Sequence, residues 1–299
     1  MKFSMFDSIL VALDGSEVAE SVLPYLQDLA PRFDSELHIF GVCIEPERGL
    51  ARLIKIYLER IASDLQEQKI KAKAVLFHGS PPDEILEYAE KNKIGLIAMT
   101  THGRGGFTRW LLGSTAEKVI QETTSPVLLV RSRRPSEAEV LERVAFSRIL
   151  VPLDGSRIGE AALPCVKALA SKIKSSVTLL HIGSPIYEAL HELQQEYKGP
   201  LPAEMVEDIM AASGSYLVGV GQAMGKKGFE VDWEVLTGDP AEKILEYASE
   251  RNFDLIAMSS HGRGGIARWV LGSVADKVIR NSEAPVLIVR SPGVTRDKP

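Results

Sequence analysis

The amino-acid sequence predicts an α/β protein made of two similar domains in tandem. Residues 79–132 align without a gap with residues 238–291, and 31 of these 54 positions are identical. Each copy opens with a short, continuous apolar run, at residues 8–13 and 148–153, which is typical of a strand buried on both faces. Similar runs then alternate with helical patterns, as in a parallel α/β sheet. We therefore expect two domains of about 150 residues, each large enough to bury its own core.

The remaining strands follow from the same kind of apolar run. Ser16 and Ser156 are expected to cap the first helix of each copy. Pro24 and Pro164 fall inside these helices and should kink them. Further strands are expected at residues 36–42, 72–77, 96–99 and 127–130 in the first copy, and at residues 179–182, 230–236, 255–258 and 286–289 in the second.

The spacing of the two copies defines the domain boundaries. We expect a first domain at residues 1–132, a linker at 133–147 with a short helix at 137–143, and a second domain at 148–299. The offset between the copies rises from 140 to 159 residues, so the second copy carries a 19-residue insertion, placed at about residues 184–201. It is expected to be either a functional loop or an inert one.

Each copy ends in an apolar strand, and an exposed apolar strand invites pairing. We expect residues 127–130 and 286–289 to pair about a pseudo-twofold axis, either within one chain, as a pseudo-dimer, or between the two chains of a homodimer.

Composition excludes several classes of protein. The formal net charge is −5 and no basic stripe is present, so nucleic acid is not an expected partner. The two cysteines, Cys43 and Cys165, stand at unmatched places in the copies, and the six histidines lack metal-ligand spacing. The sequence shows neither a signal peptide nor a run of about 18 apolar residues. A cytoplasmic protein without a membrane or metal site is expected.

A long loop follows the fourth strand of each copy. It covers residues 100–113 and 259–272 and contains the string HGRGG in both cases. Connections in α/β units usually have about 2 to 6 residues, so loops of this length are more often functional. Gly113 and Gly272 then precede Ser114 and Ser273, where a helix is expected to begin. Free amides and the helix dipole make such a point an anion site.

Other interpretations of this region remain open. Ser114 with Glu117, and Ser273 with Asp276, also match a capping box, although the repeated glycine loop favours phosphate. The histidines of the loop are expected to bond its backbone rather than to catalyse, the tryptophans to pack it, and the arginines either to neutralise phosphate or to face solvent. These residues are His102, Arg104, Arg109 and Trp110 in the first copy, and His261, Arg263, Arg268 and Trp269 in the second.

Asp14 and Asp154 follow the first strand of each copy, where open α/β sheets place ligand contacts. Either carboxylate could accept hydrogen bonds from a ribose or an adenine amino group, or could simply start a turn. No G-x-x-x-x-G-K-[ST] loop is present, which excludes a P-loop ATPase. The glycines at 219, 221 and 225 are interpreted as part of a helix.

With these motifs, nearly the whole chain resembles the universal stress protein family in its tandem form. Nucleotide-binding members carry the pattern G-x2-G-x9-G-[ST]. Nine residues separate Gly103 from Gly113, and nine separate Gly262 from Gly272, so both copies match the second half of the pattern. Thr100 and Ser259 replace its first glycine.

The resemblance implies a fold and a site. The fold is two open, parallel five-stranded sheets of order 3-2-1-4-5 with helices on both faces, Rossmann-like and adenine nucleotide alpha hydrolase-like. The ends of the first and fourth strands then meet beside the nucleoside, and the end of the second strand offers backbone contacts to adenine. The expected binding residues are Ala12, Asp14, Val42, Thr100, Gly103, Arg104, Gly113, Ser114 and Thr115 in the first copy, and Pro152, Asp154, Ile182, Ser259, Gly262, Arg263, Gly272, Ser273 and Val274 in the second.

Three functions are compared. The first is a cytoplasmic stress-response regulator that binds ATP, with Mg²⁺ as a candidate companion, in one or both domains; it lacks an evident catalytic base, so any hydrolysis would be slow. The second is a nucleotide-free interaction module, which the Thr100 and Ser259 replacements favour slightly. The third is a nucleotide-processing enzyme, against which the missing acidic metal cluster and loop lysine argue.

Overall fold

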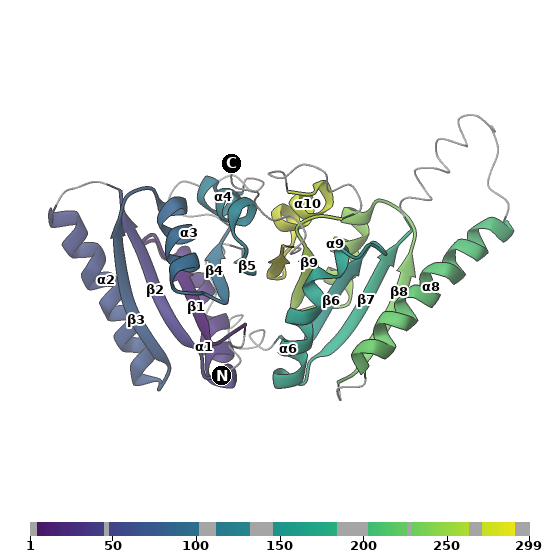
Figure 1. Cartoon of the computed structure of the whole chain (residues 1–299), viewed down its shortest axis with the longest axis horizontal. Helices are drawn as coiled ribbons and strands as arrows, with labels where there is room; N and C mark the ends of the chain where they lie inside the picture. Colours follow the sequence, from purple (N-terminus) through teal and green to yellow (C-terminus); the bar gives the residue numbers. More distant parts are fainter. Residues whose placement is uncertain are drawn as a thin grey trace.

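The computed structural model describes residues 5–44, 48–101, 112–131, 146–183, 203–225, 229–262 and 271–290. Its centre is one ten-stranded sheet of order β3-β2-β1-β4-β5-β10-β9-β6-β7-β8 (Figure 1). Each half has the expected order 3-2-1-4-5 and is parallel throughout. The two sheets are continuous with each other, which the expectation of two separate sheets did not include. The strands are β1 Ser8–Ala12, β2 Glu36–Cys43, β3 Lys71–His78, β4 Leu96–Thr100, β5 Val127–Val130, β6 Arg148–Leu153, β7 Ser176–Ile182, β8 Val231–Leu236, β9 Leu255–Ser259 and β10 Val286–Val289.

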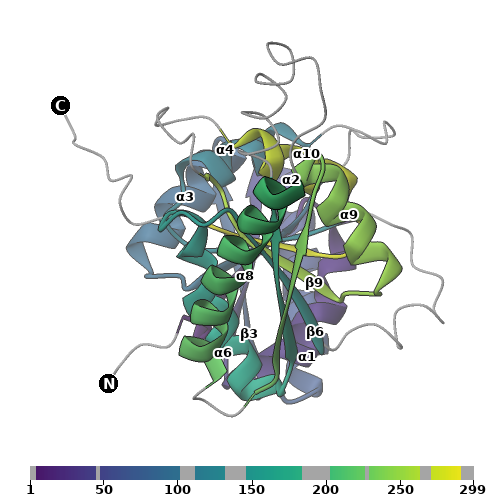
Figure 2. The same cartoon turned by 90° about the vertical axis from the view of Figure 1, so that its right-hand side faces the viewer.

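Helices cover both faces of the sheet, and each face has its own apolar core. One core joins buried leucines of α1, α2, α6 and α8, such as Leu58 and Leu217, to the sheet. The other joins α3, α4, α9 and α10 through residues such as Val119 and Val278. Figure 2 shows the right-hand end, where α8 and β8 lie at the surface. The helices are α1 Leu23–Phe33, α2 Arg48–Glu67, α3 Pro81–Lys91, α4 Ser114–Glu122, α6 Leu163–Ile173, α8 Ala203–Gly225, α9 Pro240–Glu250 and α10 Ser273–Asn281, with the 3-10 turns η1 Ala19–Val22 and η2 Gly159–Ala162.

The two halves are joined through their last strands. β5 and β10 pair antiparallel, with Leu287 opposite Leu128, and both of these side chains are almost fully buried. Arg290, just after β10, donates from Nη1 to the Gln121 carbonyl at 2.7 Å, and the Tyr25 and Phe146 rings stack at 5.8 Å. The expectation that the last strands pair is confirmed, and the pairing lies within one chain.

The prolines of the first helices do not kink them, so that expectation was wrong. Pro24 and Pro164 lie in the first turn of α1 and α6, where a helix loses no hydrogen bond to a missing N–H. Ser16 and Ser156 act earlier in the chain. Their Oγ atoms accept from Ala19 N at 3.2 Å and Gly159 N at 3.0 Å, at the start of η1 and η2.

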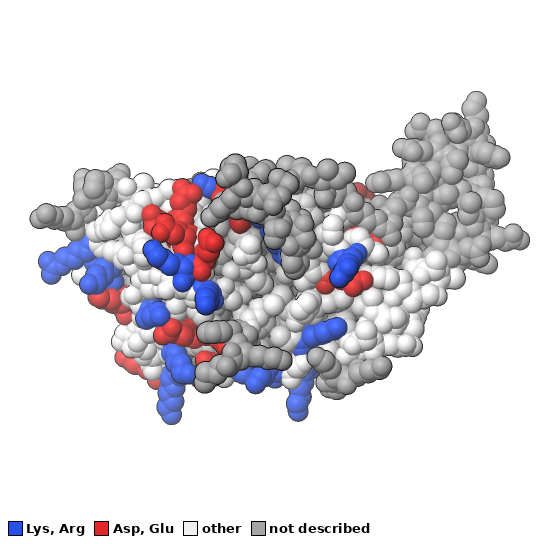
Figure 3. Space-filling view, in the orientation of Figure 1, with Lys and Arg blue, Asp and Glu red and all other residues white. Residues whose placement is uncertain are grey.

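The structure also bears on several other expectations from the sequence. The glycines at 219, 221 and 225 lie in α8, as expected. Cys43 and Cys165 are both buried, and neither is part of a disulfide within the described residues. Among the described helices, none combines the length and the apolar character that a membrane span requires. On the face shown in Figure 3, charges of both signs are interspersed over the first half. The expected insertion, the helix at 137–143 and the expected linker up to residue 145 lie outside the described residues.

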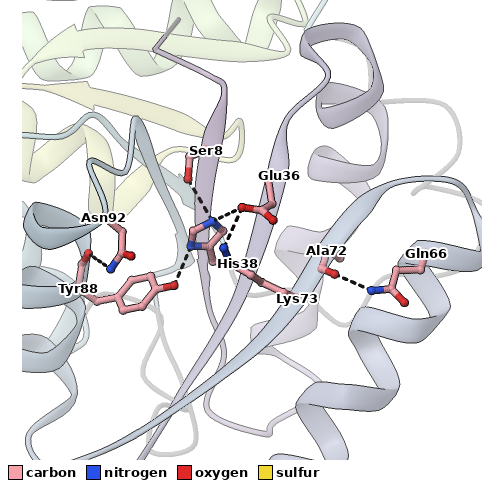
Figure 4. Close-up of polar contacts among 8 residues, drawn as sticks. All are labelled: Ser8, Glu36, His38, Gln66, Ala72, Lys73, Tyr88 and Asn92. Carbon is pink, nitrogen blue, oxygen red and sulfur yellow. Dashed lines mark hydrogen bonds and ion pairs between the residues drawn. The ribbon is translucent and has the colours of Figure 1, made fainter. Parts of the chain in front are cut away.

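A buried histidine network distinguishes the first half from the second (Figure 4). His38 of β2 is 3% exposed. Its Nε2 lies 3.2 Å from Ser8 Oγ and 3.0 Å from Glu36 Oε2, and its Nδ1 lies 3.0 Å from the Tyr88 hydroxyl. Lys73 of β3 donates to the same Glu36 oxygen at 2.8 Å. Thr178 occupies the matching place in β7.

Burial, together with the charge of Lys73, lowers the pKa of His38 below its ordinary value, although Glu36 acts in the opposite direction. The unfolded chain therefore takes up this proton at a higher pH than the folded protein. The free energy of unfolding should fall as the pH drops below about 6.5, the ordinary pKa of histidine. His38→Thr, which copies the second half, should flatten this slope in urea titrations between about pH 7.5 and 5.

The matched control is His78→Thr, which removes an exposed histidine of the same domain and should keep the wild-type slope. The pH range of the urea titrations stops near 5. The hydrogen bond from Lys73 lowers the pKa of Glu36 below its ordinary value, so the titration of Glu36 changes the free energy of unfolding only at more acid pH. A wild-type slope in the His38→Thr protein would contradict the prediction.

Candidate functional site

The candidate loops leave from the carboxyl ends of β4 and β9 and lead into α4 and α10. These two helices lie next to each other near the middle of the molecule in both ribbon views (Figures 1 and 2). The charge of Glu117 on α4 raises the pKa of Arg280 on α10, after the larger effect of the Arg280 hydrogen bond to Asp276. The pairing of β5 with β10 thus brings α4 and α10 together at the contact between the halves.

Glycine is the cap of both helices. Gly113 and Gly272 have extended ψ values of 142° and precede the first helical residue without a side-chain capping bond. Gly113 N donates to the Thr101 carbonyl at 2.8 Å, and Gly272 N donates to the Ser260 carbonyl at 2.9 Å. These two bonds fix each helix start against the end of the preceding strand.

The capping-box interpretation of Ser114 and Ser273 is wrong. Both serines are the first residues of their helices, and Glu117 N bonds the Gly113 carbonyl instead of a serine hydroxyl. The hydroxyls are exposed. The next amides in each helix also lack a partner within the described part of the chain. These free amides belong to Ser114, Thr115 and Ala116 in α4, and to Ser273, Val274 and Ala275 in α10. Such a set of donors at a helix N-terminus favours an anion.

Asp14 and Asp154 brace the turns that follow β1 and β6. Asp14 Oδ1 accepts from Ser16 N at 2.9 Å and from Ser16 Oγ at 2.6 Å. Asp154 repeats both bonds with Ser156, at 2.9 and 2.7 Å. Gly15 and Gly155 have φ values of 81° and 79°, which only glycine adopts readily. In each copy, one carboxylate oxygen of the aspartate therefore stabilises a turn, as one of the two interpretations predicted.

The end of the first strand meets the candidate loop in the second copy. A Cβ placed on Gly262 would stand 2.5 Å from Asp154 Oδ2. A Cβ on Gly159 would collide with Asp154 Oδ1. Because β6 pairs with β9, this carboxylate is enclosed by glycine backbone from two sides. The expected convergence is confirmed here.

The other expected site residues fall at strand ends. Ala12, Ile182, Thr100 and Ser259 are the last residues of β1, β7, β4 and β9. Val42 and Pro152 are the next-to-last residues of β2 and β6. The residues that lie outside the described part are His102, Gly103, Arg104, Arg109, Trp110, Arg263, Arg268 and Trp269.

Sequence reasoning missed the hydroxyl residue that directly follows β4 and β9. Thr101 and Ser260 supply the carbonyls that hold Gly113 and Gly272, and both are buried. Ser259 Oγ donates to the His261 carbonyl at 2.5 Å. The signal was present, because two adjacent hydroxyl residues follow the same apolar run in both copies.

A tyrosine from the outer helix was also missed. Tyr216 of α8 donates to Glu160 Oε1 of η2 at 3.0 Å. Tyr57 of α2 holds the matching place beside Glu20 of η1. Burial and then the charges of Glu20 and Asp14 raise the pKa of Tyr57 well above its usual value. Each long outer helix thus lies beside the 3-10 turn that follows the aspartate.

Comparison with known proteins agrees with this architecture. The model of the universal stress protein family matches residues 5–131 and 145–290. A universal stress protein of Methanocaldococcus jannaschii is 33% identical over 142 residues, covering 43% of this chain and 84% of the relative. One from Mycobacterium bovis is 24% identical over 253 residues, covering 84% of this chain and 79% of the relative.

A solved structure shows the same fold along nearly the whole chain. The universal stress protein of Archaeoglobus fulgidus superposes with a TM-score of 0.72 at 24% identity, covering 95% of this chain and 98% of that one. A different family member has been solved in complex with cAMP. The chain belongs to the universal stress protein family, and it carries two family domains in one polypeptide.

Proposed function

We propose that this protein binds adenine nucleotide, with ATP as the main ligand, in one or both domains and acts as a nucleotide-dependent regulator of a stress response. The observation that carries the proposal is the duplicated helix start with its free amides and exposed serine hydroxyl. The positive end of a helix dipole and unpaired N–H groups stabilise phosphate oxygens.

The surroundings suit the rest of a nucleotide. In the second copy the Asp154 carboxylate lies beside Gly262, one loop away from the helix start at Gly272. A ribose hydroxyl can donate to this carboxylate while the phosphate tail reaches the amides of α10. The glycines allow a ligand to approach the backbone without a side chain in between. The cAMP complex of another family member supports this class of ligand.

The placement of the two sites supports a regulatory role. α4 and α10 begin at the two sites and lie next to each other across the internal axis. Arg290, which follows β10, also bonds the Gln121 carbonyl of α4. Nucleotide in either site therefore acts on helices at the contact between the halves. We propose nucleotide binding in the cytoplasm and do not propose nucleotide hydrolysis.

A second candidate is a nucleotide-free interaction module. Three exposed large apolar side chains of the first half favour it: Ile44, Leu53 and Ile56 are 71%, 66% and 53% exposed. Such residues are typical of contact surfaces when they lie close together.

Denaturing the purified protein and analysing the supernatant by chromatography separates the two functions. Nucleotide release, or a rise in melting temperature on adding ATP, is expected for the binding protein because a ligand stabilises the folded state it binds. Finding neither would favour the interaction module.

Gly113→Val and Gly272→Val should each remove one ATP from the binding stoichiometry measured by calorimetry if both sites bind. Valine tolerates the extended backbone of a cap, but its Cβ at position 272 would stand 3.1 Å from the Ser260 carbonyl oxygen, and its methyl groups would cover the free amides. Gly219→Val is the control, since a Cβ there meets nothing within 4 Å. Unchanged ATP binding in both site variants would refute the loop assignment.

Ser114→Ala and Ser273→Ala test the serines in another way. Neither hydroxyl caps its helix, so unfolding free energies should change by less than about 0.5 kcal/mol. ATP affinity should fall roughly tenfold at the altered site, as expected for the loss of a hydrogen bond to a charged oxygen. Asp239→Ala is the matched control.

Asp239 caps α9 by accepting from Glu242 N at 3.0 Å. Its loss should lower the unfolding free energy by about 1 kcal/mol and leave ATP binding intact. A serine variant that behaves like the Asp239 variant would restore the structural interpretation of Ser114 and Ser273.

A further inference from the structure

α2 is a long outer helix with one side exposed to solvent. It lies at one end of the molecule, beside the edge strand β3 (Figure 1). Its inner side packs against the sheet through buried residues such as Leu58 and Leu65. On its solvent side, the side chains of Leu53 and Ile56 are more than half exposed. Two large apolar side chains that lie one helical turn apart form a small apolar surface, which favours a contact with a partner.

The exposed charges of α2 are sorted along the helix. The first two are basic, the last two are acidic, and the middle two have one charge of each sign. When positions are counted outward from the midpoint between residues 59 and 60, each base has an acid at the same distance on the other side. Reversing the direction of the helix therefore exchanges the two signs. In chain order, these residues are Arg52, Lys55, Glu59, Arg60, Asp64 and Glu67.

Contacts within the chain leave the bases in the middle of the helix available. Lys55 Nζ lies 3.7 Å from Glu59 Oε1, and Arg60 Nη2 lies 4.0 Å from Glu20 Oε1. The side chains of Lys55 and Arg60 are both 63% exposed. Ion pairs that are this long and this exposed contribute little to stability, so each base can turn toward another carboxylate at small cost.

The matching helix of the second half lacks this pattern. From Ala211 onward, the described side chains of α8 include no charged residue. Its exposed positions hold alanine, serine, glycine and glutamine instead. The sorted charges thus belong to the first half alone, and an association through them uses only one end of each molecule.

We propose that two copies of this chain form a homodimer by packing their α2 helices antiparallel, about a twofold axis near residues 59 and 60. The basic half of each helix then faces the acidic half of the other, with Arg52 opposite Glu67 of the second copy. Ile56 lies opposite Ser63 of the second copy, whose small side chain leaves room for it. Residues 52 and 67 lie within about 60° of each other around a helix, as do residues 56 and 63, so both pairs can share the contact face.

The charges determine the direction and the size of the assembly. A parallel pair of helices would place Arg52 against Arg52 and Glu67 against Glu67, and like charges repel. A twofold contact through one surface is closed, so assembly stops at the dimer. An anionic membrane is a poorer partner, because the face holds as many acids as bases and the chain has a net charge of −5. This inference goes beyond nucleotide binding and does not depend on it.

Sedimentation velocity of the full-length protein, over about 1 to 500 µM and without nucleotide, measures the association directly. We expect a monomer–dimer equilibrium with a dissociation constant in roughly the micromolar range, since a contact through one helix is smaller than a standard interface. Ile56→Ser should raise the dissociation constant at least about tenfold, because it removes apolar surface from the contact. This side chain is exposed in the single copy, so the melting temperature of dilute protein should stay the same.

A charge exchange tests the antiparallel direction. Arg52→Glu and Glu67→Lys should each weaken the dimer at least about tenfold, because the twofold axis makes either change create two like-charge contacts. The double variant should return to within about threefold of the wild-type dissociation constant. An equimolar mixture of the two single variants should also associate, since each then meets its complement. Glu87→Lys is the control: it changes the charge by the same amount at an exposed position of α3 and should leave the dimer unchanged.

Three results would overturn the proposal. Protein that stays monomeric across the whole concentration range would leave this face of α2 to a different partner. A dimer that neither Ile56→Ser nor the single charge variants weaken would use another surface of the molecule. A double variant that associates more weakly than both single variants would show that the two helices do not run antiparallel.

Discussion

The antiparallel pairing of β5 with β10 is the constraint on which the rest of the molecule depends. It turns two five-stranded sheets into one and buries Leu128 against Leu287. Each sheet would otherwise expose an apolar edge strand, which is a site of aggregation. Because the pairing relates the halves by an internal axis, it also brings α4 and α10 together. The arrangement of the two candidate sites is thus a consequence of how the chain covers its own sheet edges.

The candidate sites are built mostly from backbone. Gly113 and Gly272 cap their helices without a side chain, and carbonyls of buried residues at positions 101 and 260 hold them in place. The aspartates are held in turns by neighbouring serines.

The two halves differ away from these sites. His38, with Glu36 and Tyr88, forms a buried polar network in the first half, and Thr178 stands in its place in the second. In the outer helices, Arg60 lies 4.0 Å from Glu20, whereas Gly219 holds the matching position. Duplication has therefore kept the helix starts alike while the surrounding layers changed, so the halves can respond differently to pH.

The sequence by itself determined the repeat, the strands, the helix starts after Gly113 and Gly272, and the place of Asp14 and Asp154 at strand ends. These features follow from local periodicity, from the conformational freedom of glycine and from the rule that ligands meet the carboxyl ends of parallel strands. Only the tertiary structure decided that β5 pairs within the chain, that glycine rather than serine is the cap, and that the Asp154 carboxylate lies against Gly262. Each of these depends on contacts between residues far apart in the chain, or on competition between equally suitable hydrogen-bond donors, which local pattern cannot resolve.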